Sequence, residues 1–135
     1  MTVSSPHLLI FGLGYAGRAI AKEAVAAGWQ VSATYRSATR PEPGVTLLPF
    51  EQAQPVIAQA SHILTSAAPD EQGDPVLARY GAALRAAPAS WLGYLSTTGI
   101  YGDAQGGWVD ETTPPNPGSA RARRRIAAEQ GWADL

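Results

Sequence analysis

The stretch IFGLGYAGRAI constrains the fold more than any other, because its glycines have the G-x-G-x-x-G spacing. A compact apolar run precedes it at 7–12, and a run with helical periodicity follows at 15–28. Between a strand and a helix, Gly12 permits a tight turn, Gly14 lets the backbone approach a pyrophosphate and Gly17 allows close helix packing. The free N–H groups of the new helix then face the anion. This context predicts a dinucleotide-binding turn; the alternative is a glycine-rich turn that holds nothing.

The rest of the chain repeats the alternation of apolar and helical runs. We expect further strands at 30–36, 45–50, 62–67 and 91–97, a short helix at 54–60, and helices near 75–87 and after the N-cap Ser119. Strand–helix alternation builds a parallel sheet. The sequence therefore predicts an α/β fold, a Rossmann-type doubly wound parallel sheet of about five strands, as one domain over 1–135. The Gly- and Pro-rich loop at 98–118 is long enough to indicate a functional role.

Composition excludes several classes of function. The 135 residues include no cysteine, which excludes disulfides, thiolate catalysis and cysteine-ligated metal. His7 and His62 lack ligand-like spacing, so we expect them at the beginnings of strands and expect no metal. A net charge of −1 favours neither nucleic acid nor a membrane surface as a partner. The N-terminal apolar run is too short for a signal peptide or a membrane span, so we expect a cytoplasmic protein.

The end of the second predicted strand bears on the choice of dinucleotide. An acidic residue about 20 positions after the turn would bind the ribose hydroxyls of NAD. Here the sequence reads TYRSATR, with Arg36 in that place and no Asp or Glu nearby. A guanidinium can bind the 2′-phosphate of NADP through two charge-assisted hydrogen bonds, and Ser37 and Arg40 can add to the pocket. NADP(H) is favoured over NAD(H); the alternative is a solvated surface arginine.

Together with the glycine turn and Arg36, four segments carry a family resemblance: SAAPDEQGDPVL, LSTTGIYGD, WVDETTPPNP and RRIAAEQGW. The chain resembles the extended short-chain dehydrogenase/reductases, and within them the branch of NAD-dependent epimerases/dehydratases or nucleoside-diphosphate-sugar epimerases. The resemblance spans essentially the whole chain and implies a carbonyl, hydroxyl or nucleotide-sugar substrate. The cofactor-binding positions that it implies are Gly12, Leu13, Gly14, Tyr15, Ala16, Gly17, Arg36, Ser37, Ser66, Ala67 and Ala68.

The catalytic positions of that family are only partly retained. There a Ser or Thr after the fifth strand holds the substrate oxygen, a Tyr transfers the proton, and a Lys lowers the Tyr pKa and binds the nicotinamide ribose. The hydroxyl position corresponds to Thr97, unless this is only a polar strand end. The Tyr and Lys positions fall on Arg121 and Arg125. Arginine effectively never deprotonates, so Arg121 cannot be a general acid or base, whereas Arg125 can still bind a ribose.

Other groups near these positions offer alternatives. Tyr101 can supply the proton if nearby arginines lower its pKa from about 10, although the family uses this residue mainly to line the substrate site. Asp110 and Glu111 are acid/base candidates that more often pin a loop. The arginine run 121–125 opposes the helix dipole, which indicates either an anionic partner or a solvated helix face.

Length is a second departure, because family members continue through further strands and a C-terminal substrate-binding portion. The fifth strand is therefore expected to have an open edge, which invites pairing with another chain as a homodimer. Three hypotheses remain: an NADP(H)-dependent reductase or epimerase, a non-catalytic NADP(H)-binding sensor, and the cofactor half of a longer enzyme that is inactive alone.

Overall fold

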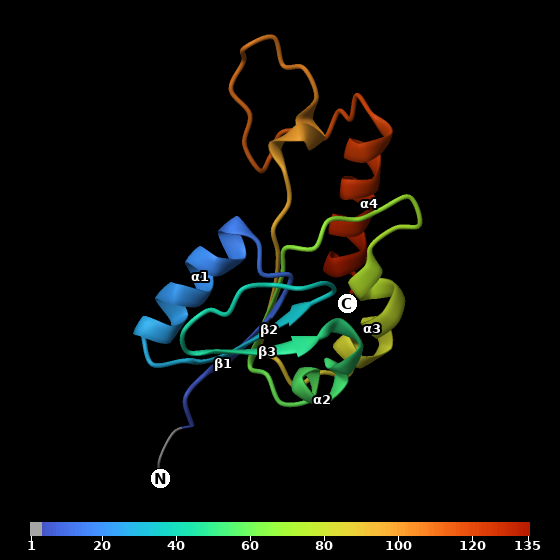
Figure 1. Ribbon diagram of the computed structural model, residues 1–135. Helices are drawn as coiled ribbons and strands as arrows, with labels where there is room; N and C mark the ends of the chain where they lie inside the picture. Colours follow the sequence, from blue (N-terminus) through green and yellow to red (C-terminus); the bar gives the residue numbers. More distant parts are fainter. Residues whose placement is uncertain (1–3) are drawn as a thin grey trace.

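The computed structural model describes residues 4–135 and alternates strands with helices (Figure 1). The elements are β1 (His7–Phe11), α1 (Tyr15–Ala26), β2 (Gln30–Tyr35), β3 (Val45–Pro49), the 3-10 turn η1 (Phe50–Gln52), α2 (Gln54–Ile57), β4 (His62–Thr65), α3 (Pro75–Arg85), β5 (Trp91–Tyr94), the 3-10 turn η2 (Thr98–Tyr101) and α4 (Ala120–Ala133). Every predicted strand and helix is confirmed in kind. The strands end earlier than predicted, because the last residues of each apolar run belong to the loops that follow.

The strands form one parallel sheet in the order β3-β2-β1-β4-β5. Strand β1 lies at the centre, and the chain builds outward from it first toward β3 and later toward β5. The carboxyl ends of β1, β2 and β4 therefore meet where the strand order reverses, which is where open α/β sheets bind ligands. This topology confirms the Rossmann-type α/β fold.

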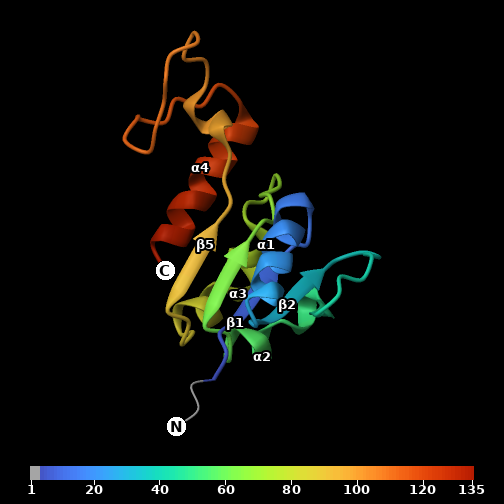
Figure 2. The same cartoon turned by 90° about the vertical axis from the view of Figure 1, so that its left-hand side faces the viewer.

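Strand β1 is buried on both faces and separates two apolar clusters. Leu9 and Phe11 belong to the cluster that includes Tyr80 of α3 and Trp132 of α4. Leu8 and Ile10, which alternate with them, join the cluster on the side of α1. A strand buried on both faces explains why the sequence pattern here is a continuous apolar run. Figure 2 shows α1 on one side of the sheet and α3 and α4 on the other.

Buried Asp74 joins two of these helices. Its Oδ1 accepts hydrogen bonds from the N–H groups of Val76 at 2.9 Å and Leu77 at 3.0 Å, and so caps the N-terminus of α3. Its Oδ2 accepts a hydrogen bond from Nε1 of buried Trp132 at 3.0 Å. One carboxylate thus caps the N-terminus of α3 and accepts the indole hydrogen bond from the end of α4.

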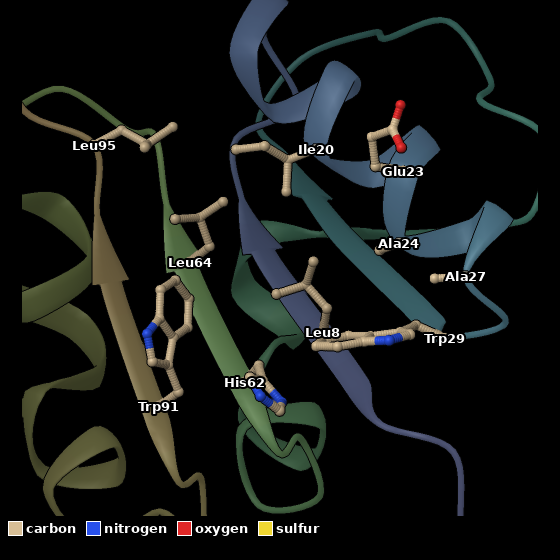
Figure 3. Close-up of a pocket in the computed structure, with 10 residues that line it drawn as sticks. All are labelled: Leu8, Ile20, Glu23, Ala24, Ala27, Trp29, His62, Leu64, Trp91 and Leu95. Carbon is tan, nitrogen blue, oxygen red and sulfur yellow. The ribbon is translucent and has the colours of Figure 1, made fainter.

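The face that carries α1 is only partly covered by it. An apolar groove of about 570 Å³ lies beside α1 over β1, β4 and β5, lined by Leu8, Ile20, Ala24, Leu64, Trp91 and Leu95 among others (Figure 3). Within the described residues β5 pairs with β4 alone, so its outer edge is open as predicted. Among residues 4–135, no helix combines the length and apolar character needed to cross a membrane.

His7 begins β1 as predicted and is buried there. Its ring Nε2 lies 2.8 Å from Oγ of Ser32, and its backbone N–H donates to Oγ of Ser61 at 2.9 Å. Burial lowers the pKa of His7 below its ordinary value of about 6.5. The unfolded chain therefore binds this proton at a higher pH than the folded chain does.

We expect acidification to destabilise the fold through His7. Stability conferred by the neutral ring is present above about pH 6.5 and is lost as the pH falls from there toward the lowered folded-state pKa. Urea unfolding at pH 7.5 and 5.5 checks this, with His7→Gln as the control. The variant should lose less stability between the two pH values than the parent; equal losses would contradict the prediction.

Candidate functional site

The glycine turn has the geometry that its spacing predicts. Gly12 has φ of +88°, a conformation that side chains disfavour. A Cβ at Gly17 would lie 2.9 Å from the carbonyl oxygen of Gly12, so α1 packs against the turn only because this residue has no side chain. Gly14 is the N-cap of α1, and nothing lies within 4 Å of where its Cβ would be. The first turn of α1 is therefore open to an approaching ligand.

The loop after β4 packs directly on this turn. The hydroxyl of Ser66 donates to the carbonyl oxygen of Gly12 at 2.6 Å, and the N–H of Ser66 donates to that of Phe11 at 2.9 Å. Ser66 thus orients the turn, a positioning role that its place in the sequence did not reveal. Ala67 is half-buried beside it, and Ala68 is exposed.

Arg36 lies at the carboxyl end of β2, next to the glycine turn. Its guanidinium carbon stands 4.9 Å from the centre of the Phe50 ring, a cation–π contact. Arg36, Phe50, Gly12 and Ala67 line one small cleft. A larger cavity of about 440 Å³ continues from Arg36 and Phe50 toward the N-terminus of α3. The structure therefore brings the predicted turn, the predicted arginine and the loop after β4 to one place.

The remaining predicted cofactor positions lie on the loops after β1 and β2 and on the first turn of α1. Leu13 is half-buried, whereas Tyr15 and Ala16 are exposed on the first turn of α1. Ser37 and Arg40 are exposed on the loop that follows β2. The exposed backbone and side chains at the carboxyl ends of β1 and β2 leave this edge accessible to a ligand.

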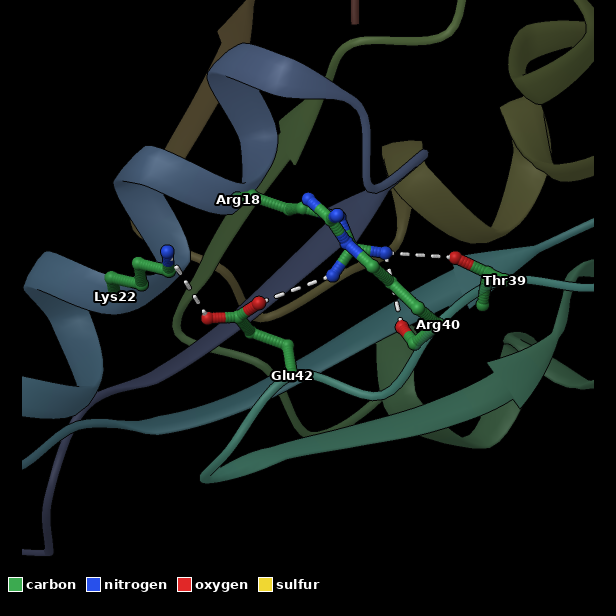
Figure 4. A network of polar contacts seen from close by, with 5 residues as sticks. All are labelled: Arg18, Lys22, Thr39, Arg40 and Glu42. Atoms are coloured by element: carbon green, nitrogen blue, oxygen red, sulfur yellow. Dashed lines mark hydrogen bonds and ion pairs between the residues drawn. The ribbon is translucent and has the colours of Figure 1, made fainter.

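Sequence reasoning missed a buried arginine beside the turn. Arg18 follows Gly17, and its guanidinium donates to the Glu42 carboxylate at 3.1 Å, to Oγ1 of Thr39 at 3.0 Å and to the carbonyl oxygen of Arg40 at 3.0 Å (Figure 4). Lys22 lies 3.9 Å from the same carboxylate. Glu42 is thus the nearest acidic residue after β2, but its carboxylate is buried against α1. The signal in the sequence was the charge of Arg18 itself, directly after Gly17, in a helical turn that was expected to pack closely.

The family's catalytic positions also come together. Thr97, Arg121 and Arg125 line a pocket of about 320 Å³ with Ser119 at the N-terminus of α4. The Arg125 guanidinium donates to the carbonyl oxygen of Leu95 at 2.9 Å, which fixes it to the end of β5. Ser119 caps α4 as predicted, accepting a hydrogen bond from the N–H of Ala122 at 3.1 Å.

Two alternatives for the proton donor have different positions. Tyr101 is half-buried in η2, and among the described residues it is not part of the wall around Thr97 and Arg121. Asp110 is fully exposed and accepts hydrogen bonds from the side chain of Thr112 at 2.6 Å and its N–H at 2.9 Å. These bonds, with weaker ones from Thr113, lower the pKa of the Asp110 carboxyl. Asp110 therefore pins a loop, as one of the sequence alternatives anticipated.

The arginine run of α4 is not neutralised within residues 4–135. No Asp or Glu of this range forms an ion pair with Arg121, Arg123, Arg124 or Arg125. Arg121 and Arg123 are exposed, whereas Arg124 and Arg125 are half-buried. The pocket beside Thr97 is consequently cationic.

Comparison with solved structures identifies proteins that share this fold. A functionally unknown conserved protein from Silicibacter pomeroyi is 43% identical, with a TM-score of 0.85 over 95% of this chain and 48% of its own. A putative epimerase from Burkholderia cenocepacia is 29% identical, with a TM-score of 0.79 over 96% of this chain and 51% of its own. A putative NAD-dependent epimerase/dehydratase from Methylobacillus flagellatus is 25% identical, with a TM-score of 0.77 over 93% and 49%. No family model and no curated protein matches the chain.

More distant structures share the fold. The UDP-glucose 4-epimerase of Thermus thermophilus, solved in complex with NAD, is 24% identical with a TM-score of 0.74 over 95% of this chain and 50% of its own. Over nearly its whole length the chain is similar to structures described as a putative epimerase and a putative NAD-dependent epimerase/dehydratase. It spans about half the length of the structures that it matches.

Proposed function

We propose that this chain is the NADP(H)-binding half of a reductase or epimerase that acts on a carbonyl or hydroxyl substrate. The observation that carries the proposal is the cleft in which Gly12 and Arg36 meet at the carboxyl ends of β1 and β2. The Thermus thermophilus relative holds NAD on the same fold, which supports a nicotinamide dinucleotide as the ligand. The exposed arginines after β2 support a preference for the form that bears a 2′-phosphate.

The donors at the cleft match the parts of such a cofactor. The first-turn N–H groups of α1, left without a side-chain cap at Gly14, would bind the pyrophosphate. Arg36, Ser37 and Arg40 would bind the 2′-phosphate, while Glu42 is held away by Arg18 and would not repel it. The positions Leu13, Tyr15, Ala16, Ala67 and Ala68 would supply backbone and van der Waals contacts around these groups.

The chemistry would take place beside Thr97. When bound, the nicotinamide supplies or accepts a hydride at the reacting carbon. Thr97 would hydrogen-bond the substrate oxygen, and Arg125, tied to the end of β5, would contact the nicotinamide ribose. Arg121 would stabilise negative charge on the substrate but cannot move a proton. Tyr101 or a substrate group would have to provide the proton, and a nucleotide sugar would bring the anionic phosphate that the cationic pocket favours.

A second candidate is a cytoplasmic NADP(H) sensor without turnover. It is favoured by one observation, the presence of Arg121 and Arg125 where the family has its proton-transfer pair. The open edge of β5 would then pair with a second copy of the chain as a homodimer.

Titration of the purified chain with NADPH and NADH, followed by nicotinamide fluorescence, tests the proposal. Saturable binding with NADPH the tighter ligand is expected, and binding of neither nucleotide would refute it. Oxidation of NADPH with a panel of carbonyl compounds and nucleotide sugars then separates the enzyme from the sensor. Sedimentation velocity with and without NADPH tests the homodimer.

Two glycine variants separate binding from folding at the turn. Gly14→Ala should leave stability within about 1 kcal/mol of the parent, because its Cβ meets nothing, but should weaken NADPH binding by crowding the pyrophosphate. Gly17→Ala should cost about 1–3 kcal/mol of stability, because the new Cβ would lie against the Gly12 carbonyl. Urea unfolding and NADPH titration of both variants check this. Equal stability losses in the two would contradict the assignment of roles.

A further inference from the structure

The buried side chain of Arg18 attaches the loop between β2 and β3 to α1. Arg18 is 9% exposed and Glu42 is 8% exposed, and their side chains form an ion pair across 3.1 Å. The second guanidinium nitrogen donates to Oγ1 of Thr39 and to the carbonyl oxygen of Arg40. All three partners of Arg18 thus belong to residues 39–42, and one of them is backbone.

This arrangement is better suited to fixing a conformation than to adding stability. A buried ion pair regains little more than the cost of removing both charges from water. The planar guanidinium, however, imposes direction on each of its hydrogen bonds. Three such bonds, to three residues within the segment 39–42, therefore define the path of this loop relative to the glycine turn.

This loop follows Arg36, which lines the cleft beside Gly12, and it carries the exposed residues Ser37 and Arg40. Arg36 and Ser37 precede its anchored part, and Arg40 lies within it. In Figure 4 the side chain of Arg40 extends from the loop toward α1. The Glu42 carboxylate is directed at Arg18 and Lys22 instead of the cleft. Arg18 thus withdraws the one acidic side chain of the loop and leaves its cations exposed.

We propose that Arg18 is a positioning residue for dinucleotide selection. It holds residues 37–42 in the conformation that presents Arg36, Ser37 and Arg40 to a 2′-phosphate, and it keeps Glu42 from competing for the ribose. The inference rests on the proposed binding of NADP(H). Without Arg18 the loop would relax and the freed carboxylate would favour ribose hydroxyls over a phosphate.

The test compares NADPH and NADH affinities across matched variants of the full chain. Arg18→Met leaves the Glu42 carboxylate free, whereas Arg18→Met with Glu42→Leu removes both charges and avoids an unpaired buried one, which protects the fold. Thr39→Val removes one hydrogen bond and retains the ion pair. Lys22→Met is the control, since it removes a cation of α1 that contacts Glu42 but not the loop backbone. Circular dichroism and urea unfolding establish that each variant is folded.

The ratio of NADPH to NADH affinity should fall by about tenfold or more in Arg18→Met, which corresponds to at least one lost hydrogen bond to a charged group. The double variant should show a smaller fall, and Thr39→Val the smallest, while Lys22→Met keeps the parental ratio. Amide hydrogen exchange at 37–42 should be faster in the Arg18 variants without any nucleotide. A purely structural Arg18 would weaken both nucleotides equally and leave their ratio unchanged.

The outcomes distinguish this inference from the proposed function. If the parent prefers NADPH, Arg36→Ala removes the preference and the Arg18 variants retain it, the positioning role is wrong and the proposed function stands. If the parent shows no preference for NADPH, the loop selects nothing and both are overturned. Should the Arg18 variants fail to fold, Thr39→Val decides: a parental ratio together with parental loop exchange overturns the inference.

Discussion

Replacing Arg36 with alanine is expected to weaken NADPH binding by roughly tenfold to a hundredfold and to change NADH binding little. The guanidinium stands at the carboxyl end of β2 beside Gly12, where a 2′-phosphate would lie. One hydrogen bond to a charged group is worth about 1.5–3 kcal/mol, and this sets the size of the effect. Fluorescence titration with both nucleotides measures it directly. Stability should change little, because Arg36 is exposed.

Matched variants make this result specific. Arg36→Lys retains the charge but not the two-pronged hydrogen bonding, so its NADPH affinity should lie between those of the parent and Arg36→Ala. Arg85→Ala removes an arginine from the last turn of α3, away from the cleft, and should leave both affinities unchanged. Equal losses of NADPH and NADH affinity in Arg36→Ala would instead indicate that Arg36 contacts the adenine or maintains the fold.

Replacing Asp74 with alanine should destabilise the protein by about 2–4 kcal/mol. The substitution removes the cap of α3, worth about 1 kcal/mol, and leaves the buried Nε1 of Trp132 without an acceptor, at a further 1–3 kcal/mol. The midpoint of urea unfolding should fall with little change in its slope.

Asp74→Ser and Trp132→Phe separate the two contributions. Serine can still cap α3 but cannot reach Trp132, so its loss should be smaller than that of alanine. In the background of Trp132→Phe, Asp74→Ala should cost little more than the cap, because the indole donor is already gone. If the stability losses of the two single variants add up in the double variant, the hydrogen bond between Asp74 and Trp132 contributes nothing to the free energy of unfolding.

Much of the fold could be predicted because its signals are local. The apolar run at 7–12 indicated a strand buried on both faces, and β1 is that strand. The Ser119 hydroxyl marked the beginning of α4 correctly. The carboxyl ends of the strands were extended too far, since Gly12 and Arg36 continue the residue pattern but belong to the loops that form the site. Periodicity does not distinguish the last paired residue from the first unpaired one.

The site was predictable only where one segment carries all its information. The spacing of Gly12 and Gly17 was enough to predict their roles, because the turn brings them together within a few residues. Arg18 was missed, because its partners lie in a loop whose path depends on the sheet. The meeting of Thr97 with Arg121 was expected from the family resemblance alone, since residue patterns do not show how α4 packs.

The contact between Arg36 and Phe50 affects when the entropic cost of ordering the Arg36 side chain is incurred, on folding or on binding. A free arginine side chain has about 2 kcal/mol of rotamer entropy, part of which it loses when it grips a ligand. Here the guanidinium lies over the Phe50 ring as part of the fold, and this contact restricts its rotamers. The side chain therefore loses much of this rotamer entropy when the protein folds, and less remains to be lost when a phosphate binds. The Phe50 ring that restricts it is also part of the core.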